Sequence, residues 1–182
     1  MKKMTEQHLI NAFGSESQAN MRYLHFADQA GKENLPNTAR LFWAIAYSES
    51  VQADSHYLEL RHLEGGFIVN SMAAFGPGNT KKNLKLAIMG ENFVITEMYP
   101  AYIEAAKFQE EKGAERTFTW AYLTEKIHKQ LFEKTKEAID RNNDIEPKPI
   151  QVCKVCGYTR EGEVPNKCPQ CKATKEYFIT FK

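Results

Sequence analysis

The four cysteines of the chain form two Cys-x-x-Cys pairs near its C-terminal end, Cys153 with Cys156 and Cys168 with Cys171. This spacing predicts two loops that together offer four thiolates to one tetrahedral metal ion. Gly157, directly after the second cysteine, allows the tight turn that such a loop needs. The spacing alone is compatible with a structural zinc ion as well as with an iron ion.

A second set of possible metal ligands lies in an internal repeat. When residues 40–52 are laid over residues 116–128, several residue types coincide and Glu49 falls on Glu125. Both glutamates share a helix face with apolar residues four and seven positions earlier, which indicates that they point into a core. The repeat therefore places two buried carboxylates at equivalent positions of two helices.

Each repeat is preceded by a helix with its own glutamate at a matching distance, Glu16 in the first unit and Glu91 in the second. Two such helical hairpins facing each other would bring four carboxylates to one place. Buried carboxylates repel one another without a cation, so a divalent metal is the expected partner, and solvated glutamates on a charged surface are the alternative. The segment EKIH at 125–128 also sets Glu125 and His128 on one side of a helix.

The elements that must position these groups follow from the hydrophobic periodicity. It predicts four long helices at about 5–31, 36–63, 80–112 and 113–141. The segment at about 65–80 has Gly and Pro at both ends and is long for a hairpin loop, so we expect it to cross the bundle from end to end. The predicted fold is an all-α four-helix bundle of the ferritin-like type, followed by a small metal-bound domain.

The boundary between the two parts is visible in the composition. After the last helical pattern, Pro147 and Pro149 stiffen a short linker. The residues beyond it are too few to build a core of their own, so they need a bound metal ion to stabilise their fold. We therefore predict a helical domain at residues 1–146 and a metal-dependent domain at residues 147–182.

The overall composition excludes several classes of function. With 24 Lys+Arg against 23 Asp+Glu the charges nearly cancel, which argues against a nucleic-acid-binding surface. No apolar run approaches the ~20 residues of a membrane span, and the N-terminal segment is too polar for a signal peptide. Because a metal would occupy every cysteine, none is left for a disulfide, and we expect a cytoplasmic protein.

Taken together, these motifs resemble those of rubrerythrin over nearly the full length. The motifs are GSESQANMRY around Glu16, the helix with Glu49, GENFVITEMYP around Glu91, EKIH at 125–128, and a tail whose CKVCGY and CPQC resemble rubredoxin. The resemblance implies a non-haem di-iron centre bridged by Glu49 and Glu125. It also implies Glu16 and Glu91 as terminal ligands, His128 on one iron, and one further iron on Cys153, Cys156, Cys168 and Cys171.

The resemblance also implies a peroxidase. Such proteins reduce hydrogen peroxide to water, with electrons passed from a reductase or another donor through the tail to the di-iron site. They are commonly homodimers in which the tail of one subunit approaches the di-iron site of another. Two other functions stay open, a ferroxidase or metal-handling protein and an electron carrier with a degenerate di-metal site.

Two positions depart from the family pattern. The repeat pairs Gln52 with His128, so a second Glu-x-x-His has become Glu-x-x-Gln, and Val94 stands where the family has a further glutamate. We expect neither Glu97 nor His56 to replace the missing ligands. Six residues after Glu91, Glu97 faces another side of its helix, and seven residues after Glu49, His56 lies ~10 Å further along the helix axis. The two metal positions become unequal, which is compatible with a mixed-metal pair and with reduced turnover.

Two tyrosines and Gln52 are predicted around the ligands rather than among them. Tyr23 and Tyr99 follow Glu16 and Glu91 by about two helical turns. Their hydroxyls could hydrogen-bond the carboxylates across the bundle or pass a proton, and plain core packing is the alternative.

Overall fold

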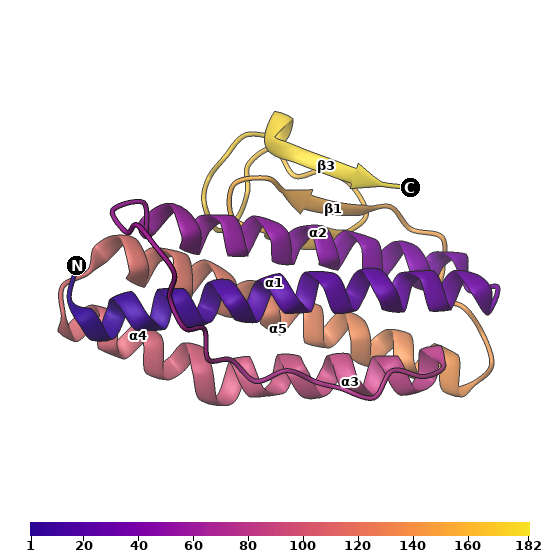
Figure 1. Ribbon diagram of the computed structural model, residues 1–182. Helices are drawn as coiled ribbons and strands as arrows, with labels where there is room; N and C mark the ends of the chain where they lie inside the picture. Colours follow the sequence, from indigo (N-terminus) through magenta and orange to yellow (C-terminus); the bar gives the residue numbers. More distant parts are fainter.

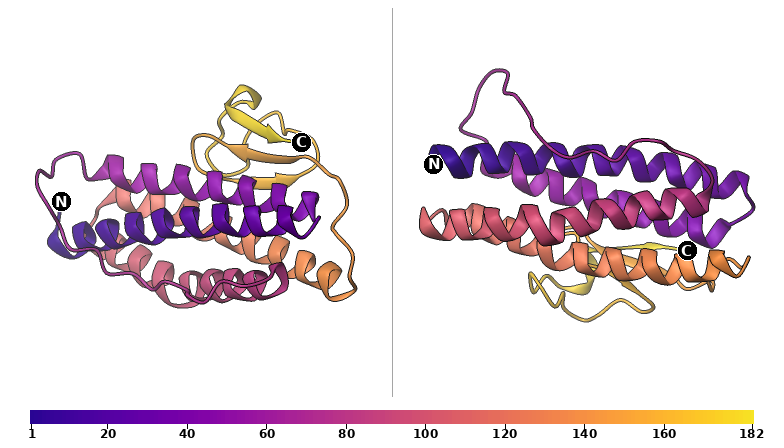
Figure 2. Two further views of the ribbon diagram at one scale, coloured as in Figure 1. Left: turned by 45° about the vertical axis from the view of Figure 1, so that its right-hand side comes forward. Right: turned by 90° about the horizontal axis from the view of Figure 1, so that it is seen from below.

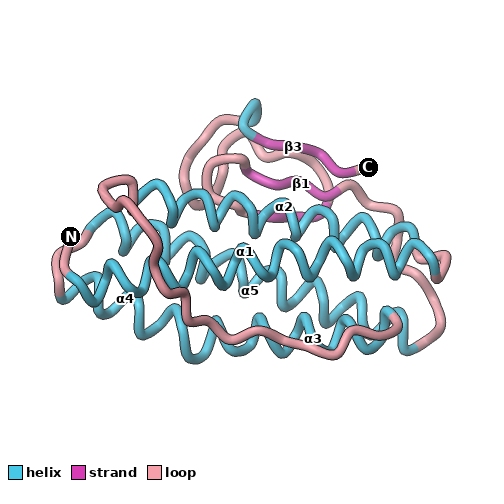
Figure 3. The backbone as a smooth tube through the Cα atoms, in the orientation of Figure 1, coloured by secondary structure: helices cyan, strands magenta, loops and turns pink.

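The computed structural model describes residues 1–182 and consists of a long helical bundle with a small sheet domain against its side (Figure 1). The helices of the bundle are α1 (Lys3–Lys32), α2 (Pro36–Glu59), α3 (Thr80–Phe93), α4 (Tyr99–Phe108) and α5 (Lys112–Asp140). The segment between α2 and α3 runs outside the bundle along its length, as the loop trace in Figure 3 shows. The predicted four-helix bundle with a long crossover and a C-terminal domain is confirmed.

The third helix of the bundle is interrupted by a π-helical segment, η1 (Val94–Met98), which joins α3 to α4. Pro100 has no backbone N–H, so it cannot donate the hydrogen bond of a regular turn. The N–H of Tyr99 bonds instead to the carbonyl oxygen of Val94 in the wider π pattern. The distortion at this proline thus takes the form of a π segment, which begins about one turn after Glu91.

Helix α2 ends at Glu59, one turn earlier than the sequence suggested. The N–H of Leu60 bonds to the carbonyl oxygen of Tyr57 at 2.9 Å, and the N–H of Leu63 bonds to that of Leu60 at 2.8 Å. Each of these hydrogen bonds joins residues only three positions apart, so the chain forms turns after the helix. The crossover begins after these turns.

The crossover packs closely on α1. A side chain at Gly14 would place its Cβ only 2.0 Å from Cγ1 of Val69, so this contact requires glycine. The crossover and the C-terminal domain lie on opposite sides of the bundle, as the two views in Figure 2 show. None of the helices is both long enough and apolar enough to cross a membrane.

The C-terminal domain contains a three-stranded antiparallel sheet in the order β2-β1-β3. Its strands are β1 (Ile150–Cys153), β2 (Thr159–Glu161) and β3 (Phe178–Phe181). Ile150 and Val152 are buried in the same apolar cluster as Phe42 of α2, so the sheet shares the core of the bundle. This shared core fixes the domain on α2.

The linker before the sheet is also fixed to the bundle. The Asp144 carboxylate accepts hydrogen bonds from the backbone N–H groups of Asn37 and Thr38, at 2.8 and 3.0 Å. These groups belong to the first turn of α2, where a negative charge is favourable. The chain therefore returns from the end of α5 to the start of α2 before it enters the sheet.

Candidate functional site

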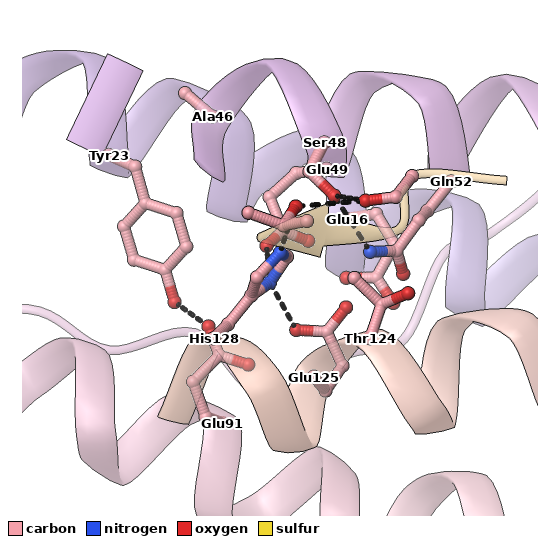
Figure 4. Close-up of polar contacts among 12 residues, drawn as sticks. Glu16, Tyr23, Ala46, Ser48, Glu49, Gln52, Glu91, Thr124, Glu125 and His128 are labelled. Carbon is pink, nitrogen blue, oxygen red and sulfur yellow. Dashed lines mark hydrogen bonds and ion pairs between the residues drawn. The ribbon is translucent and has the colours of Figure 1, made fainter. Parts of the chain in front are cut away.

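The four glutamates singled out by the repeat lie at the centre of the bundle, one on each of four helices. Glu16 belongs to α1, Glu49 to α2, Glu91 to α3 and Glu125 to α5, and each side chain is at most 2% exposed. Figure 4 shows them pointing toward one another. Two clusters of buried apolar side chains make up the core of the bundle around them, one with Phe42 and Phe132 and the other with Phe118.

His128 joins three of these carboxylates in a compact donor group. Donor atoms of Glu49, Glu91, Glu125 and His128 all lie within 4.8 Å of one another. His128 Nδ1 is 3.0 Å from Glu49 Oε1 and 3.1 Å from Glu125 Oε2. Glu16 lies next to this group, but its carboxylate is not among the donor atoms that lie within 4.8 Å of one another. The arrangement offers oxygen and nitrogen donors to a pair of metal ions.

Several buried oxygen atoms of the group have no hydrogen-bond partner. They are Glu49 Oε2, Glu125 Oε1 and Gln52 Oε1. A buried acceptor without a partner costs free energy, and such atoms are rare in proteins. Cations bound between the helices would satisfy all three, so the residues present fit a di-metal centre.

Burial shifts the protonation of these carboxylates. It raises the pKa of Glu16 to about 8 and that of Glu125 to about 8, from an ordinary value of 4.5. Burial, together with repulsion from Glu125, also raises the pKa values of Glu49 and Glu91. Without metal the site therefore holds protons at neutral pH, and metal binding must release them.

These raised pKa values predict how the metal-free protein responds to pH. Carboxylates whose pKa is higher in the folded state stabilise it below pH 4.5, and this stabilisation is lost as pH rises through about 8. We expect the melting temperature of the metal-free protein to fall between pH 5 and pH 8.5. Metal-free Glu125→Gln should show a weaker fall, and an equally steep fall in both proteins would contradict the assignment.

Both predicted tyrosines hydrogen-bond carboxylates of the site. The hydroxyl of Tyr23 donates to Glu91 Oε1 at 2.5 Å, and the hydroxyl of Tyr99 donates to Glu16 Oε1. Burial raises the pKa of each phenol well above its usual value, so both stay protonated. The tyrosines thus orient two carboxylates across the bundle.

His56 lies behind Tyr99 rather than at the donor group. Its Nε2 is 3.1 Å from the Tyr99 hydroxyl and its Nδ1 is 3.1 Å from Thr117 Oγ1. Burial lowers its pKa to about 3, so the imidazole is neutral. This position agrees with the expectation that His56 does not replace a missing ligand.

The positions that depart from the family pattern also face the site. Gln52 is 2% exposed, its Nε2 lies 3.4 Å from Ser48 Oγ, and its Oε1 has no partner. Val94 is buried at the start of η1 and lines the cavity beside the carboxylates. Glu97 is exposed, as expected for a residue turned away from the donor group.

The four cysteines meet in one place in the C-terminal domain. Sγ atoms lie 3.6 Å apart in the pairs Cys153–Cys171 and Cys156–Cys168, and all four lie within 4.8 Å of one another. All four are free thiols. Each pair joins one cysteine from each loop, which is the arrangement that a single tetrahedral ion requires.

The cysteine loop touches the bundle directly beside the carboxylates. The carbonyl oxygen of Gly157 accepts hydrogen bonds from Ser48 Oγ at 2.6 Å and from Thr159 Oγ1 at 2.9 Å. Thr159 Oγ1 is in turn 3.1 Å from Nε2 of His128. A Cβ at Gly157 would lie 2.9 Å from Ser48 Oγ, so glycine permits this close approach.

The residues of this contact were not predicted from the sequence. Ser48 and Thr159 carry no motif, and small polar residues of this kind are common in any chain. The only available signal is their position, because Ser48 precedes Glu49 and Thr159 follows the Cys153-x-x-Cys156 loop.

Both the helical part and the C-terminal part of the chain match known protein families. The family model described as Rubrerythrin matches residues 7–136, and the one described as the rubredoxin-like domain of rubrerythrin matches residues 151–179. Rubrerythrin-2 of Clostridium acetobutylicum is 43% identical over 178 residues, which cover 98% of this chain and 97% of that protein.

Solved structures agree with the sequence matches. Nigerythrin in its fully reduced, all-ferrous state superposes with a TM-score of 0.85 and 29% identity, covering 97% of this chain and 86% of that one. A bacterioferritin of Rhodobacter capsulatus superposes with a TM-score of 0.68 and 18% identity, covering 78% of this chain and 88% of that one, which supports the ferritin-like fold alone. Together with the two donor groups, these matches support a non-haem di-iron centre in the bundle and one iron on the four cysteines.

Proposed function

We propose that this chain, which belongs to the rubrerythrin family, reduces hydrogen peroxide to water in the bundle, with electrons arriving through its rubredoxin-like domain. The observation that carries the proposal is the position of His128. Its Nδ1 faces the carboxylates, and its Nε2 contacts Thr159 of the rubredoxin-like domain. One imidazole therefore connects the two metal sites.

We assign the metal ligands of the bundle as Glu16, Glu49, Glu91, Glu125 and His128. In the reaction the O–O bond breaks, and each oxygen atom gains one electron and one proton to give water. Bound by these residues, a pair of irons would supply the redox chemistry, that is, the two electrons that each peroxide needs, and the tail iron would be the source of replacement electrons. The carboxylates are hard oxygen donors that suit both oxidation states.

Side chains of the protein hold the protons that the reaction needs. The Tyr99 hydroxyl donates to Glu16, and the Tyr23 hydroxyl donates to Glu91. Behind Tyr99, the neutral imidazole of His56 continues the hydrogen-bonded chain to Thr117. These groups hold protons next to the carboxylates while the apolar core excludes bulk water.

Electrons reach the pair by a short hydrogen-bonded route within one chain. It runs from the Cys156–Gly157 backbone to Thr159 and on to His128. This contact favours a peroxidase over a ferroxidase, for which the tail would be superfluous. A reductase as electron donor, a homodimeric or larger assembly and a cytoplasmic location stay predictions.

Anaerobic stopped-flow mixing tests the proposed function. The fully reduced protein is mixed with hydrogen peroxide, and the visible absorption of the tail iron is followed. Rapid reoxidation of the tail iron is expected, because its electron refills the oxidised pair. A tail iron that stays reduced in the presence of peroxide would contradict the proposal.

The inequality of the two metal positions gives a further prediction. An amide oxygen is a weaker ligand than imidazole, so the metal nearest Gln52 should bind less tightly than the one nearest His128. Gln52→His should raise its affinity by at least about tenfold, because imidazole is the stronger ligand. Chelator competition under anaerobic conditions measures this. The exposed Gln130→His is the matched control, and equal affinities at both positions in the unaltered protein would refute the inequality.

A further inference from the structure

A narrow cavity leads from the carboxylates to the outside of the bundle between α1 and α3. Its inner end is lined by the glutamates of the site, and its outer end by Gln18, Arg22 and Met72. Its free volume of about 10 Å³ leaves room for roughly one water-sized molecule. The wall between is formed in part by Gly90, which has no side chain, and by Val94, whose side chain is apolar.

A much wider groove lies directly outside. It has a volume of about 530 Å³ and runs between residues 69–72 of the crossover and the η1 segment. Met72 is the residue of the crossover that lines both the groove and the narrow cavity. The half-buried Met72 side chain therefore stands at the junction between solvent and the carboxylates.

The crossover holds Met72 in this position through specific contacts. The Gln18 amide donates to the carbonyl oxygen of Met72 at 2.8 Å, and Arg22 donates to the Gln18 amide oxygen. A few residues earlier, Val69 fits into the space that Gly14 leaves on α1. The backbone at the junction is thus held in place, and Gln18 and Arg22 are tied to each other and to this backbone, which leaves the Met72 side chain as the one at the outer end without such a contact.

We propose that the oxidant enters past Met72 and that Met72 is a specificity-determining residue, which admits hydrogen peroxide and excludes alkyl hydroperoxides. The proposal rests on the proposed peroxidase function. Hydrogen peroxide is only slightly larger than water, whereas tert-butyl hydroperoxide carries four additional carbon atoms. The passage also opens on the crossover side, opposite the rubredoxin-like domain (Figure 2), so oxidant and electrons approach from different faces.

The test compares Met72→Ala with Met72→Trp in the full chain loaded with iron. Reduced protein is mixed with hydrogen peroxide or with tert-butyl hydroperoxide, and the ratio of the two rate constants is measured. Met72→Ala should raise the ratio in favour of tert-butyl hydroperoxide at least tenfold. The exposed Met89→Ala on α3 is the matched control and should leave the ratio unchanged.

A second measurement does not depend on turnover. Azide binding to the oxidised protein is followed by its absorbance change, and its association rate should fall at least fivefold in Met72→Trp. Visible spectra and iron content show that each variant is folded and loaded. Unchanged ratios and azide rates in both variants would overturn the proposed passage. A protein that does not react with hydrogen peroxide, yet shows the expected azide rates, would overturn the peroxidase function and leave the passage standing.

Discussion

Replacing Glu49 and Glu125 by alanine together should slow the peroxide-driven reoxidation of the tail iron at least 100-fold. Both carboxylates are 1% exposed and face each other across α2 and α5. They contribute the oxygen atoms without hydrogen-bond partners at the centre of the donor group. Without them, His128 also loses both acidic neighbours of its Nδ1, so no pair of metal ions can be held.

The measurement is the same anaerobic stopped-flow experiment, performed on protein whose tail iron is reduced. Removing two buried carboxylates that repel each other should not unfold the metal-free bundle, and the tail spectrum confirms that the rubredoxin-like domain is intact. The exposed pair Glu104→Ala and Glu137→Ala is the matched control. If the tail iron is reoxidised as fast in the Glu49/Glu125 variant as in the unaltered protein, the chain is an electron carrier and the bundle is not the peroxide site.

The helices and the crossover could be predicted because their signals are local. Apolar periodicity, Pro36 at the start of α2, and the glycines and prolines of the crossover all act within a few residues. For the π segment, the sequence signal is Pro100, which indicates only that the helix is distorted there. Its form depends on how the N–H of Tyr99 finds the carbonyl oxygen of Val94, which no sequence pattern specifies.

The donor group could be predicted because the repeat displays it twice. Buried carboxylates at equivalent positions of two hairpins indicate a site for a cation, and this argument needs no coordinates. The connection between the two metal sites could not be predicted in the same way. It depends on how the sheet packs against α2, which brings Gly157 to Ser48 and Thr159 to His128.

The packing of the sheet also places the rubredoxin-like domain and the opening of the narrow cavity on different sides of the bundle. The rubredoxin-like domain lies against α2 and α5, and the narrow cavity opens between α1 and α3. In the proposed reaction an electron would therefore approach through His128 and the oxidant from the opposite side. This arrangement would keep peroxide away from the cysteine thiolates, which it would oxidise.

Cys153→Ser should remove the iron from the tail and abolish turnover that depends on a reductase. The four sulfur atoms lie within 4.8 Å of one another, and exchanging one thiolate for a neutral hydroxyl removes both a strong ligand and a negative charge from the ion. The red colour expected of an oxidised iron with four thiolate ligands should disappear. The tail should keep its place on α2, because Ile150 and Val152 are buried in the core of the bundle.

Two measurements separate the tail from the bundle in this variant. Metal analysis after anaerobic purification should show iron in the bundle and none in the tail. When the pair is reduced chemically instead of through the tail, a single addition of hydrogen peroxide should still oxidise it at the rate of the unaltered protein, because Glu49, Glu91, Glu125 and His128 are untouched. Thr180→Ser, which keeps the hydroxyl that donates to Gln151, is the control within the same domain. Zinc alone in the tail of the unaltered protein, or unchanged reductase-dependent turnover in Cys153→Ser, would show that electrons do not pass through the cysteine site.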